Sequence, residues 1–109
     1  MTSPSPVVKP SISVTSGGDG SFRVNGSAFA PNATVNIRVA HADQPLLTNI
    51  LFNTTASPDG KVQDFPTGNV CRLPGGRIAF SARDGRIDPV DHSALVSNFV
   101  TTTCPLQNP

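Results

Sequence analysis

The sequence predicts an all-β domain, an antiparallel β-sandwich of about seven strands, from three observations. Short stretches of the chain alternate apolar with polar residues, which is the pattern of a half-buried strand. Turn residues separate these stretches at nearly regular spacing, and no helical pattern that could serve as a crossover lies between them. The composition also opposes helices, because eleven Pro and nine Gly stand beside two Lys and no Glu. Together these features favour a sandwich over a parallel sheet.

The expected strands are placed by this alternation and by the turns between them. Residues 35–40 give the clearest example, since Val, Ile and Val alternate with Asn, Arg and Ala. The strands are expected at 11–15, 22–25, 35–40, 50–55, 62–65, 77–82 and 95–103. The side chains that point inward in this register form the predicted core: Ile12, Val14, Phe22, Val24, Phe29, Val35, Ile37, Val39, Phe52, Ile78, Phe80 and Val100.

One domain accounts for the whole chain, because 109 residues leave no room for a second domain of ordinary size. We expect an extended Pro/Ser-rich segment over 1–9, the sandwich domain over 10–104 and a tail over 105–109. A long polar loop is expected at 84–93. The first residues have neither a basic start nor an apolar core, so we expect that a signal peptide was removed or that the protein is released by lysis as part of a virus particle.

Two cysteines allow one disulfide, between Cys71 and Cys104. If the last two expected strands run antiparallel, both cysteines lie at the same end of the domain, within bonding reach, and the bond clasps the final hairpin. In a polar, Ser/Thr-rich chain an oxidised pair indicates an extracellular location: secreted, on a cell surface or on a virion exterior. The alternative is two unpaired, buried thiols.

Charge and hydropathy exclude two classes of partner. The formal net charge is +1, so the sequence offers no electrostatic argument for nucleic acid or for an anionic membrane surface. No apolar run approaches the roughly 20 residues of a membrane-spanning helix, so membrane insertion is not expected.

Several segments resemble the immunoglobulin-like (Ig-like) surface domains of bacteria and phages. FRVNGSAFAPNATVNI at 22–37 resembles their F-x-V-x-G-S-G-F-x-P-G-x-x-V-x-I stretch, and TASPDGKV at 55–62 resembles their T-x-x-x-D-G-x-F turn and strand. IAFSARD at 78–84 and SNFVT at 97–101 are similar to their Y-x-V-x-A-x-D and S-N-x-V-x endings. The resemblance covers most of residues 10–103 and implies an Ig-like sandwich. The front half is also similar to the enediyne-carrier apoproteins, which usually have a second disulfide that this chain lacks.

Catalytic residues are not expected. The histidines are His41 and His92, and the second of them lies in the tripeptide Asp91-His92-Ser93. This tripeptide has the residue types of a catalytic triad, but adjacent side chains diverge and cannot form the relay. The sequence therefore predicts no enzyme activity and no cofactor.

Three aspartates of the expected loop, Asp84, Asp88 and Asp91, have the oxygen chemistry of calcium ligands. The alternative is that these side chains solvate the loop and cap its turns. Their spacing matches no EF-hand pattern, so no metal site is predicted, and these three aspartates are only weak candidates for calcium ligands.

The expected loop at 84–93 is the candidate binding surface. It is longer than hairpin connections usually are, and a rigid sandwich that presents a loop is a common way to bind a partner. The alternative is a tolerated insertion without a ligand. The polar side chains proposed to make the contacts are Arg83, Arg86, Asp88, Asp91 and His92.

The function expected from these features is that of a non-enzymatic Ig-like surface module. It would have a structural, adhesion or attachment role on a virion or cell surface, with a protein or a carbohydrate as its partner. The alternative is a small-molecule carrier of the enediyne-apoprotein type, which needs a deep apolar cleft between loops. A pocket of several hundred cubic ångströms would favour the carrier.

Overall fold

A computed structural model describes residues 9–17, 20–43, 49–71, 75–88 and 92–105. Within these ranges the regular secondary structure consists of β-strands alone, and all strand pairs are antiparallel. The strands are β1 (Ser11–Ser16), β2 (Ser21–Ser27), β3 (Thr34–His41), β4 (Ile50–Thr55), β5 (Val62–Asn69), β6 (Arg77–Ile87), β7 (Ala94–Val96) and β8 (Val100–Thr103). The all-β prediction is confirmed.

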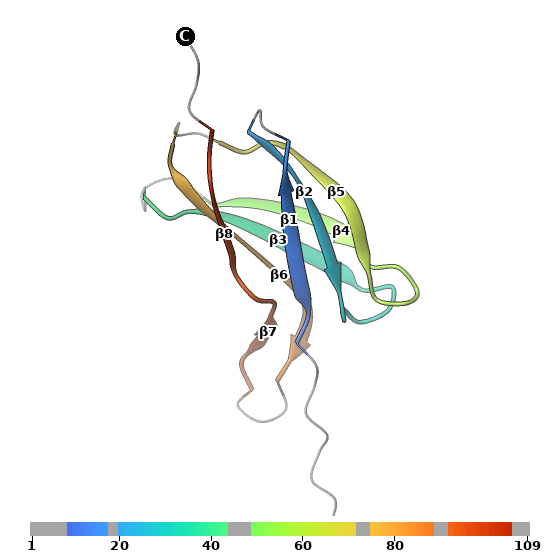
Figure 1. The fold of residues 1–109 in the computed structure, drawn as a ribbon. Helices are drawn as coiled ribbons and strands as arrows, with labels where there is room; N and C mark the ends of the chain where they lie inside the picture. Colours follow the sequence, from blue (N-terminus) through green and yellow to red (C-terminus); the bar gives the residue numbers. More distant parts are fainter. Residues whose placement is uncertain (1–8, 18–19, 44–48, 72–74, 89–91, 106–109) are drawn as a thin grey trace, which may run out of the picture.

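The strands form two sheets that pack face to face (Figure 1). The first sheet has the order β1-β2-β5, and the second has the order β4-β3-β6 with β7 and β8 both paired to the free edge of β6. Within the described ranges, no helix has the length and hydropathy needed to cross a membrane.

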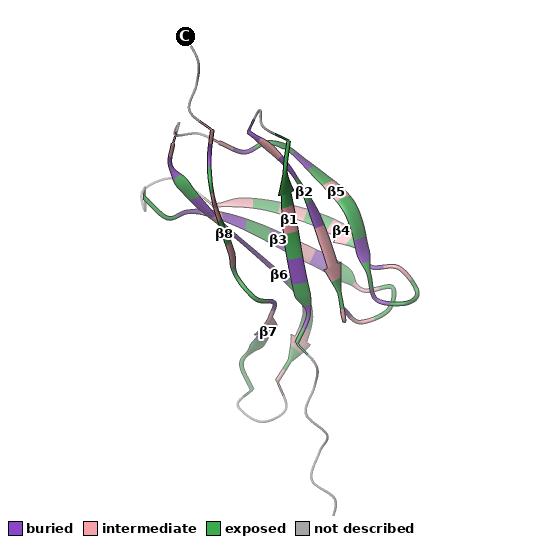
Figure 2. Ribbon diagram, in the orientation of Figure 1, coloured by how far each residue is buried: buried purple, intermediate pink, exposed green. Residues whose placement is uncertain are grey.

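The core lies between the two sheets, where the inward residues of most strands are buried and those of β4 and β8 are half-buried (Figure 2). Nine of the twelve predicted core residues are buried, and the other three, Val14, Phe52 and Val100, are half-buried and pack against the same cluster. Two edge-to-face ring contacts join the sheets: the centroids of Phe22 and Phe80 are 5.3 Å apart, and those of Phe52 and Phe65 are 5.7 Å apart.

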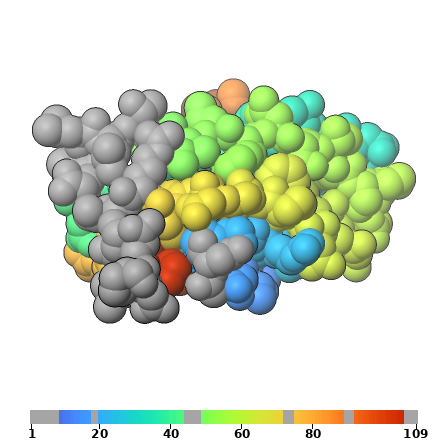
Figure 3. Space-filling model, turned by 90° about the horizontal axis from the view of Figure 1, so that it is seen from above, coloured from blue at the N-terminus to red at the C-terminus, as the bar shows by residue number. Residues whose placement is uncertain are grey.

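The contact between Phe52 and Phe65 brings together the edge strands of the two sheets. Residues of β4 (green) and β5 (yellow) lie side by side on the molecular surface (Figure 3). The two sheets therefore meet along this edge as well as through their centres.

The last strand is interrupted, which corrects the prediction of one strand over 95–103. Between the pairs Phe80↔Val100 and Arg83↔Val96, β6 advances by three residues and its partner by four. The extra residue makes a β-bulge between β7 and β8. Ser97 stabilises it, because its N–H donates to the Ala82 carbonyl at 2.8 Å and its hydroxyl accepts from the Ala82 N–H at 2.9 Å.

The bulge also aims a side chain at the other sheet. The Asn98 Oδ1 accepts from the Ile12 N–H at 2.8 Å, and the Asn98 Nδ2 donates to the Ile12 carbonyl at 3.1 Å. Through these two bonds one side chain pairs with the backbone of the edge strand β1, as a neighbouring strand would.

The long polar loop expected at 84–93 is shorter in the structure. Strand β6 continues to Ile87, which pairs with Ala94 at the start of β7, so only 88–93 connect the strands. The register shifts between Arg83 and Ile87, and Gly85 there has a φ of 88°. A bulge at a glycine therefore accommodates residues that polarity alone assigned to a loop.

The predicted disulfide between Cys71 and Cys104 is present, with the two Cα atoms 5.7 Å apart. Its place in the fold differs from the expected clasp across one hairpin. Cys71 follows β5 in the first sheet, whereas Cys104 follows β8 in the second. The bond therefore joins the two sheets at one end of the sandwich.

Candidate functional site

The candidate residues at and around the expected loop lie in different environments, as far as the structure describes them. Asp84 is buried at the end of the sandwich opposite the disulfide, where its side chain has no exposed area. Its Oδ2 accepts from the Ala30 N–H at 2.8 Å and from the Arg86 Nε at 2.7 Å. Its Oδ1 accepts from the Arg86 N–H at 3.1 Å. Both carboxylate oxygens thus have protein donors.

Arg86 completes this cluster. Its Nη2 donates to the Ala28 carbonyl at 2.7 Å, while its Nε pairs with Asp84. Ala28 has a φ of 65°, a conformation that non-glycine residues rarely adopt. The pair of Asp84 and Arg86 therefore fixes the corner that connects β2 to β3, so these two side chains have a structural explanation.

The pKa of Asp84 reflects this environment. Burial on its own would raise the pKa of the carboxyl group, because a charged group loses solvation. The N–H groups of Ala30 and Arg86 and the charge of the Arg86 guanidinium outweigh burial and hold the pKa below its ordinary value. Asp84 is thus an ionised anchor at neutral pH.

The remaining candidate residues are Asp88, Asp91, His92 and Arg83. Asp88 is half-buried, and His92 is exposed with a φ of 60°. The His92 N–H donates to the Asp88 carbonyl at 2.9 Å, which joins the two sides of the connection between β6 and β7. Asp91 lies outside the described residues. Arg83 is exposed on the strand itself. Among the described residues, no three His, Cys, Asp or Glu side chains gather as a metal site would require.

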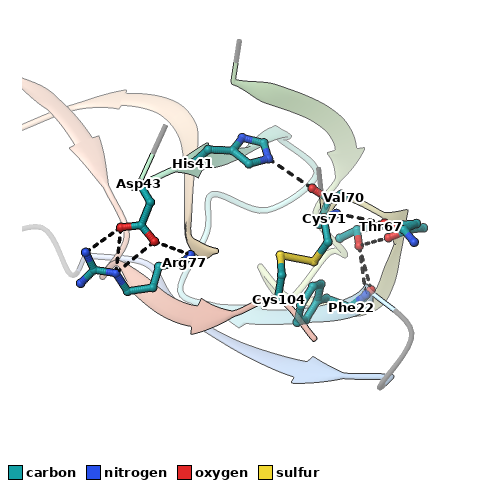
Figure 4. The surroundings of a disulfide bond; sticks show 10 residues. Phe22, His41, Asp43, Thr67, Val70, Cys71, Arg77 and Cys104 are labelled. Carbon is teal, nitrogen blue, oxygen red and sulfur yellow. Dashed lines mark hydrogen bonds and ion pairs between the residues drawn. A yellow bond between two sulfur atoms is a disulfide. The ribbon is translucent and has the colours of Figure 1, made fainter. Parts of the chain in front are cut away.

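His41 lies at the other end of the sandwich, next to the disulfide (Figure 4). It is buried, and its Nε2 lies 3.3 Å from the Val70 carbonyl oxygen. Its Nδ1 has no hydrogen-bond partner among the described residues. This contact joins β3 of the second sheet to the end of β5 in the first, beside the covalent link.

A groove of about 700 Å³ lies on the outer face of the second sheet. We call it the outer-sheet groove. It crosses β4, β3, β6 and the bulge between β7 and β8, and most of its side chains occupy the outward positions of these strands. The residues that line it are Asn36, Arg38, Asn49, Leu51, Asn53, Ser81, Ala82, Arg83, Val96 and Phe99.

The strand register arranges these side chains in two rows across the sheet. In one row Arg38 stands between its partners Leu51 and Ser81, and in the next Asn36 stands between Asn53 and Arg83. Phe99 lies on the bulge beyond β6. Leu51 and Phe99 are 68% and 70% exposed, so two large apolar side chains flank a polar centre without being covered by the domain itself.

The groove is electropositive, since its lining has two arginines and no carboxylate among the described residues. With the Asn49 amide oriented so that its oxygen faces Arg38, that oxygen accepts from Nη2 at 2.5 Å and from Nε at 2.9 Å. This neutral partner orients the guanidinium without neutralising it. Within the described part of the chain, Arg83 likewise has no carboxylate at salt-bridge distance.

Sequence reasoning found one residue of this groove, Arg83, and assigned it to a loop. The signal that could have found the other residues was the set of positions that point outward when the alternating apolar residues of a strand point inward. If Ile37 and Val39 point inward, Arg38 points outward, and if Val100 points inward, Phe99 points outward. An exposed Phe was therefore implied by the same register that predicted the core.

Comparisons with known proteins give no match: no family model, no curated protein and no solved structure is significantly similar to this chain.

Proposed function

We propose that this chain is a non-enzymatic, Ig-like attachment module that works outside the cell and binds glycans through the outer-sheet groove. The strand order supports the Ig-like assignment. In that fold the first, second and fifth strands share one sheet, and the third, sixth and seventh share the other. With β7 and β8 counted as one interrupted strand, these six strands of the chain are divided in the same way, whereas its fourth strand joins the second sheet and not the first, where the seven-stranded constant-type fold has it. Its fourth strand pairs with the third.

The observation that carries the proposal is the groove itself. It lies on a sheet whose central strands β3 and β6 are paired on both sides, so the binding side chains stand on a rigid support. Exposed Phe99 and Leu51 flank amide and guanidinium groups there. These side chains offer a ligand apolar contact at both sides of the groove and hydrogen-bonding groups between them.

Two further features agree with this proposal. The described lining of the groove has no His, Cys, Asp or Glu, the side chains that most often serve as general bases or strong nucleophiles, which supports binding over catalysis. A disulfide in a small domain is compatible with an extracellular location.

A glycan array tests the proposal, with native mass spectrometry of the bound glycans. We expect retention of at least one glycan class, with the ligand mass unchanged after incubation. A double variant, Leu51→Ala with Phe99→Ala, should lose at least tenfold in affinity. Ile87→Ala removes a third exposed apolar side chain, 61% exposed on the far hairpin, and should change nothing. Equal losses in both variants, or retention of no glycan at all, would exclude glycan attachment through this groove.

The small-molecule carrier is a second candidate, because the volume of the groove lies in the range of ordinary ligand pockets. The site differs from a deep apolar cleft between loops, since it lies on a sheet face and six of its ten lining residues are polar. A neutral naphthalene fluorophore separates the two functions. Micromolar binding of this probe, lost in the double variant, would favour the carrier.

A further inference from the structure

We propose that the outer-sheet groove selects acidic saccharides, with a sugar carboxylate bound between Arg38 and Arg83. This inference rests on the proposed glycan attachment and names the class of glycan. It depends on the charges of the groove, on the register that brings the two arginines together and on the exposed side chains at its rim.

The two arginines are close enough to share one anion. Arg38 pairs with Ser81, and Arg83 lies two residues farther along the same strand. The arginines are therefore diagonal neighbours on one face, a position in which two residues lie about 7–8 Å apart and their Cβ atoms somewhat closer. Guanidinium groups on such long side chains can converge on a carboxylate placed between them. Asn49 already binds Nε and Nη2 of Arg38, so Arg38 would reach the carboxylate through Nη1, while the fork of Arg83 can make a two-point contact.

Among the described residues, no carboxylate compensates the charges in the groove. The described lining includes no acidic residue, and the partner of Arg38 within the described part of the chain is the neutral amide of Asn49. In contrast, Arg77 and Arg86 are each paired with an aspartate at 2.7 Å. The groove thus contains two cationic side chains for which an anionic ligand would be the complement.

The rest of the lining fits a sugar ring. Phe99 offers an exposed aromatic face that can cover the apolar C–H surface of a pyranose, and Leu51 does the same from the other side. The side-chain amides of Asn36 and Asn53 each offer a donor and an acceptor, as sugar hydroxyls require. An anion without a sugar would leave these groups unused.

An acidic peptide fits less well. Extended peptides bind sheets by adding a strand to a free edge, where unpaired N–H and C=O groups are available. Strands β3 and β6 at the centre of the groove are paired on both sides, so their backbones have little to offer a peptide. Recognition here must come from side chains, which favours a ligand rich in hydroxyl and carboxylate groups.

The test uses titration calorimetry of the whole chain with acidic oligosaccharides, namely oligogalacturonates and sialyl-oligosaccharides, each beside its neutral methyl ester. We expect the ester of the preferred glycan to bind at least tenfold more weakly than the acid. This comparison needs no mutation, so misfolding cannot affect it. A polyglutamate peptide and inorganic phosphate are added as competitors and should not displace the saccharide at matched charge.

Substitutions then locate the carboxylate. Arg38→Gln and Arg83→Gln should each lower the affinity for the acid about tenfold and leave the affinity for the ester nearly unchanged. Arg23→Gln is the matched control, because Arg23 is exposed on β2 of the opposite sheet and its loss changes the net charge equally. Circular dichroism melting curves verify that each variant is folded.

Equal binding of acid and ester would overturn the inference, as would an Arg23→Gln loss equal to the other two or displacement by polyglutamate. Neutral glycans bound through Phe99 and Leu51 would leave the proposed attachment function standing while excluding the acidic ligand. Failure of every glycan, acidic and neutral, would overturn both.

Discussion

The two ends of the sandwich are held together by different means. At one end the Cys71–Cys104 bond and the contact of His41 with Val70 join the sheets (Figure 4). At the other end no covalent link is present among the described residues. There Asp84 and Arg86 bind the corner between β2 and β3, and the Phe29 N–H donates to the Gly60 carbonyl at 3.0 Å.

This difference shows two ways to fix a loop onto a small core. A disulfide acts mainly by restricting the unfolded chain and tolerates changes in its surroundings. The polar cluster acts in the folded state, and each member depends on the others, because a buried charge that loses its partner destabilises the fold. We therefore expect the non-covalent end to be the more sensitive to single substitutions.

The largest effect is expected at Gly60, in the turn between β4 and β5. Gly60 has a φ of 77°, and a Cβ atom there would overlap the carbonyl oxygen of Phe29. Gly60→Ala should lower the free energy of unfolding by about 4 kcal/mol, because backbone strain, the overlap and a lost hydrogen bond add together. Urea denaturation measures it.

Gly85→Ala is the matched control for that variant. Gly85 has a φ of 88°, yet a Cβ atom there would meet nothing within 4 Å. Its substitution should therefore cost only the backbone strain, about 1–2 kcal/mol. Equal losses at the two glycines would mean that the contact between the turn and Phe29 contributes little to this end.

Removal of the disulfide is expected to rank second. The bond closes a loop with a sequence separation of 33, for which the chain-entropy model gives about 3.5 kcal/mol. The double variant Cys71→Ala with Cys104→Ala should melt roughly 10–20 °C lower and remain folded at room temperature. Scanning calorimetry of the oxidised, reduced and substituted protein measures this change. An unchanged melting temperature would show that the disulfide contributes little to the stability of its end of the sandwich.

The covalent end could be predicted from the sequence, and the non-covalent end could not. Two cysteines leave one possible pairing, and the antiparallel arrangement expected for the last two strands placed both at the same end, although the bond joins the two sheets and not one hairpin. The period-2 pattern also predicted most of the core, because Phe22, Val35 and Phe80 occupy alternate, inward positions of their strands. Such signals are local and repeat along the chain.

The cluster at the other end depends on contacts that no local pattern contains. Asp84 binds Ala30, 54 residues away, and Arg86 binds Ala28, 58 residues away. In the sequence these two side chains look like solvated loop residues, since charged residues are rarely buried unless paired. The bulge at Gly85 places them inside, and a bulge is visible only once the register of the partner strand is known.

The groove was missed for a related reason. Its residues come from four strands, from the bulge and from Asn49 before β4, and the outward residues of β3, β4 and β6 taken one strand at a time are mostly polar, as on any sheet exposed to water. The neighbours of Arg38 become visible when β3 is aligned with β4 and β6. Sequence patterns thus predict which face a side chain occupies, and the register determines which side chains share that face.

A smaller effect is expected from Asp84→Asn at neutral pH. The substitution leaves the shape of the side chain almost unchanged and removes the charge that pairs with Arg86 at 2.7 Å. We expect a loss of about 2–3 kcal/mol, because Arg86 keeps its charge and loses its partner. Asp43→Asn breaks an equally short but exposed pair with Arg77 and should have a much smaller effect. A loss at Asp43 as large as that at Asp84 would show that burial is not what makes the cluster important.

The smallest effect, and the most specific, is the pH dependence of the difference in unfolding free energy between wild type and Asp84→Asn. The Asp84 pKa is lower in the folded chain than its ordinary value of 3.8, so its contribution to stability is complete above that value and is lost as the pH falls through the folded pKa. Asp84→Asn cannot titrate at this position. The gap in unfolding free energy between wild type and variant should therefore stay constant from pH 7 to about pH 5 and shrink below about pH 4. Asp43 and Asp59 also have lowered pKa values, the first through its hydrogen bonds with Arg77 and the second through one with Ser57, but both remain in each protein and cancel in the difference. A gap that grows on acidification would mean that the Asp84 carboxyl is stabilised in its protonated form, and that the non-covalent end is held by neutral hydrogen bonds instead of by a charge.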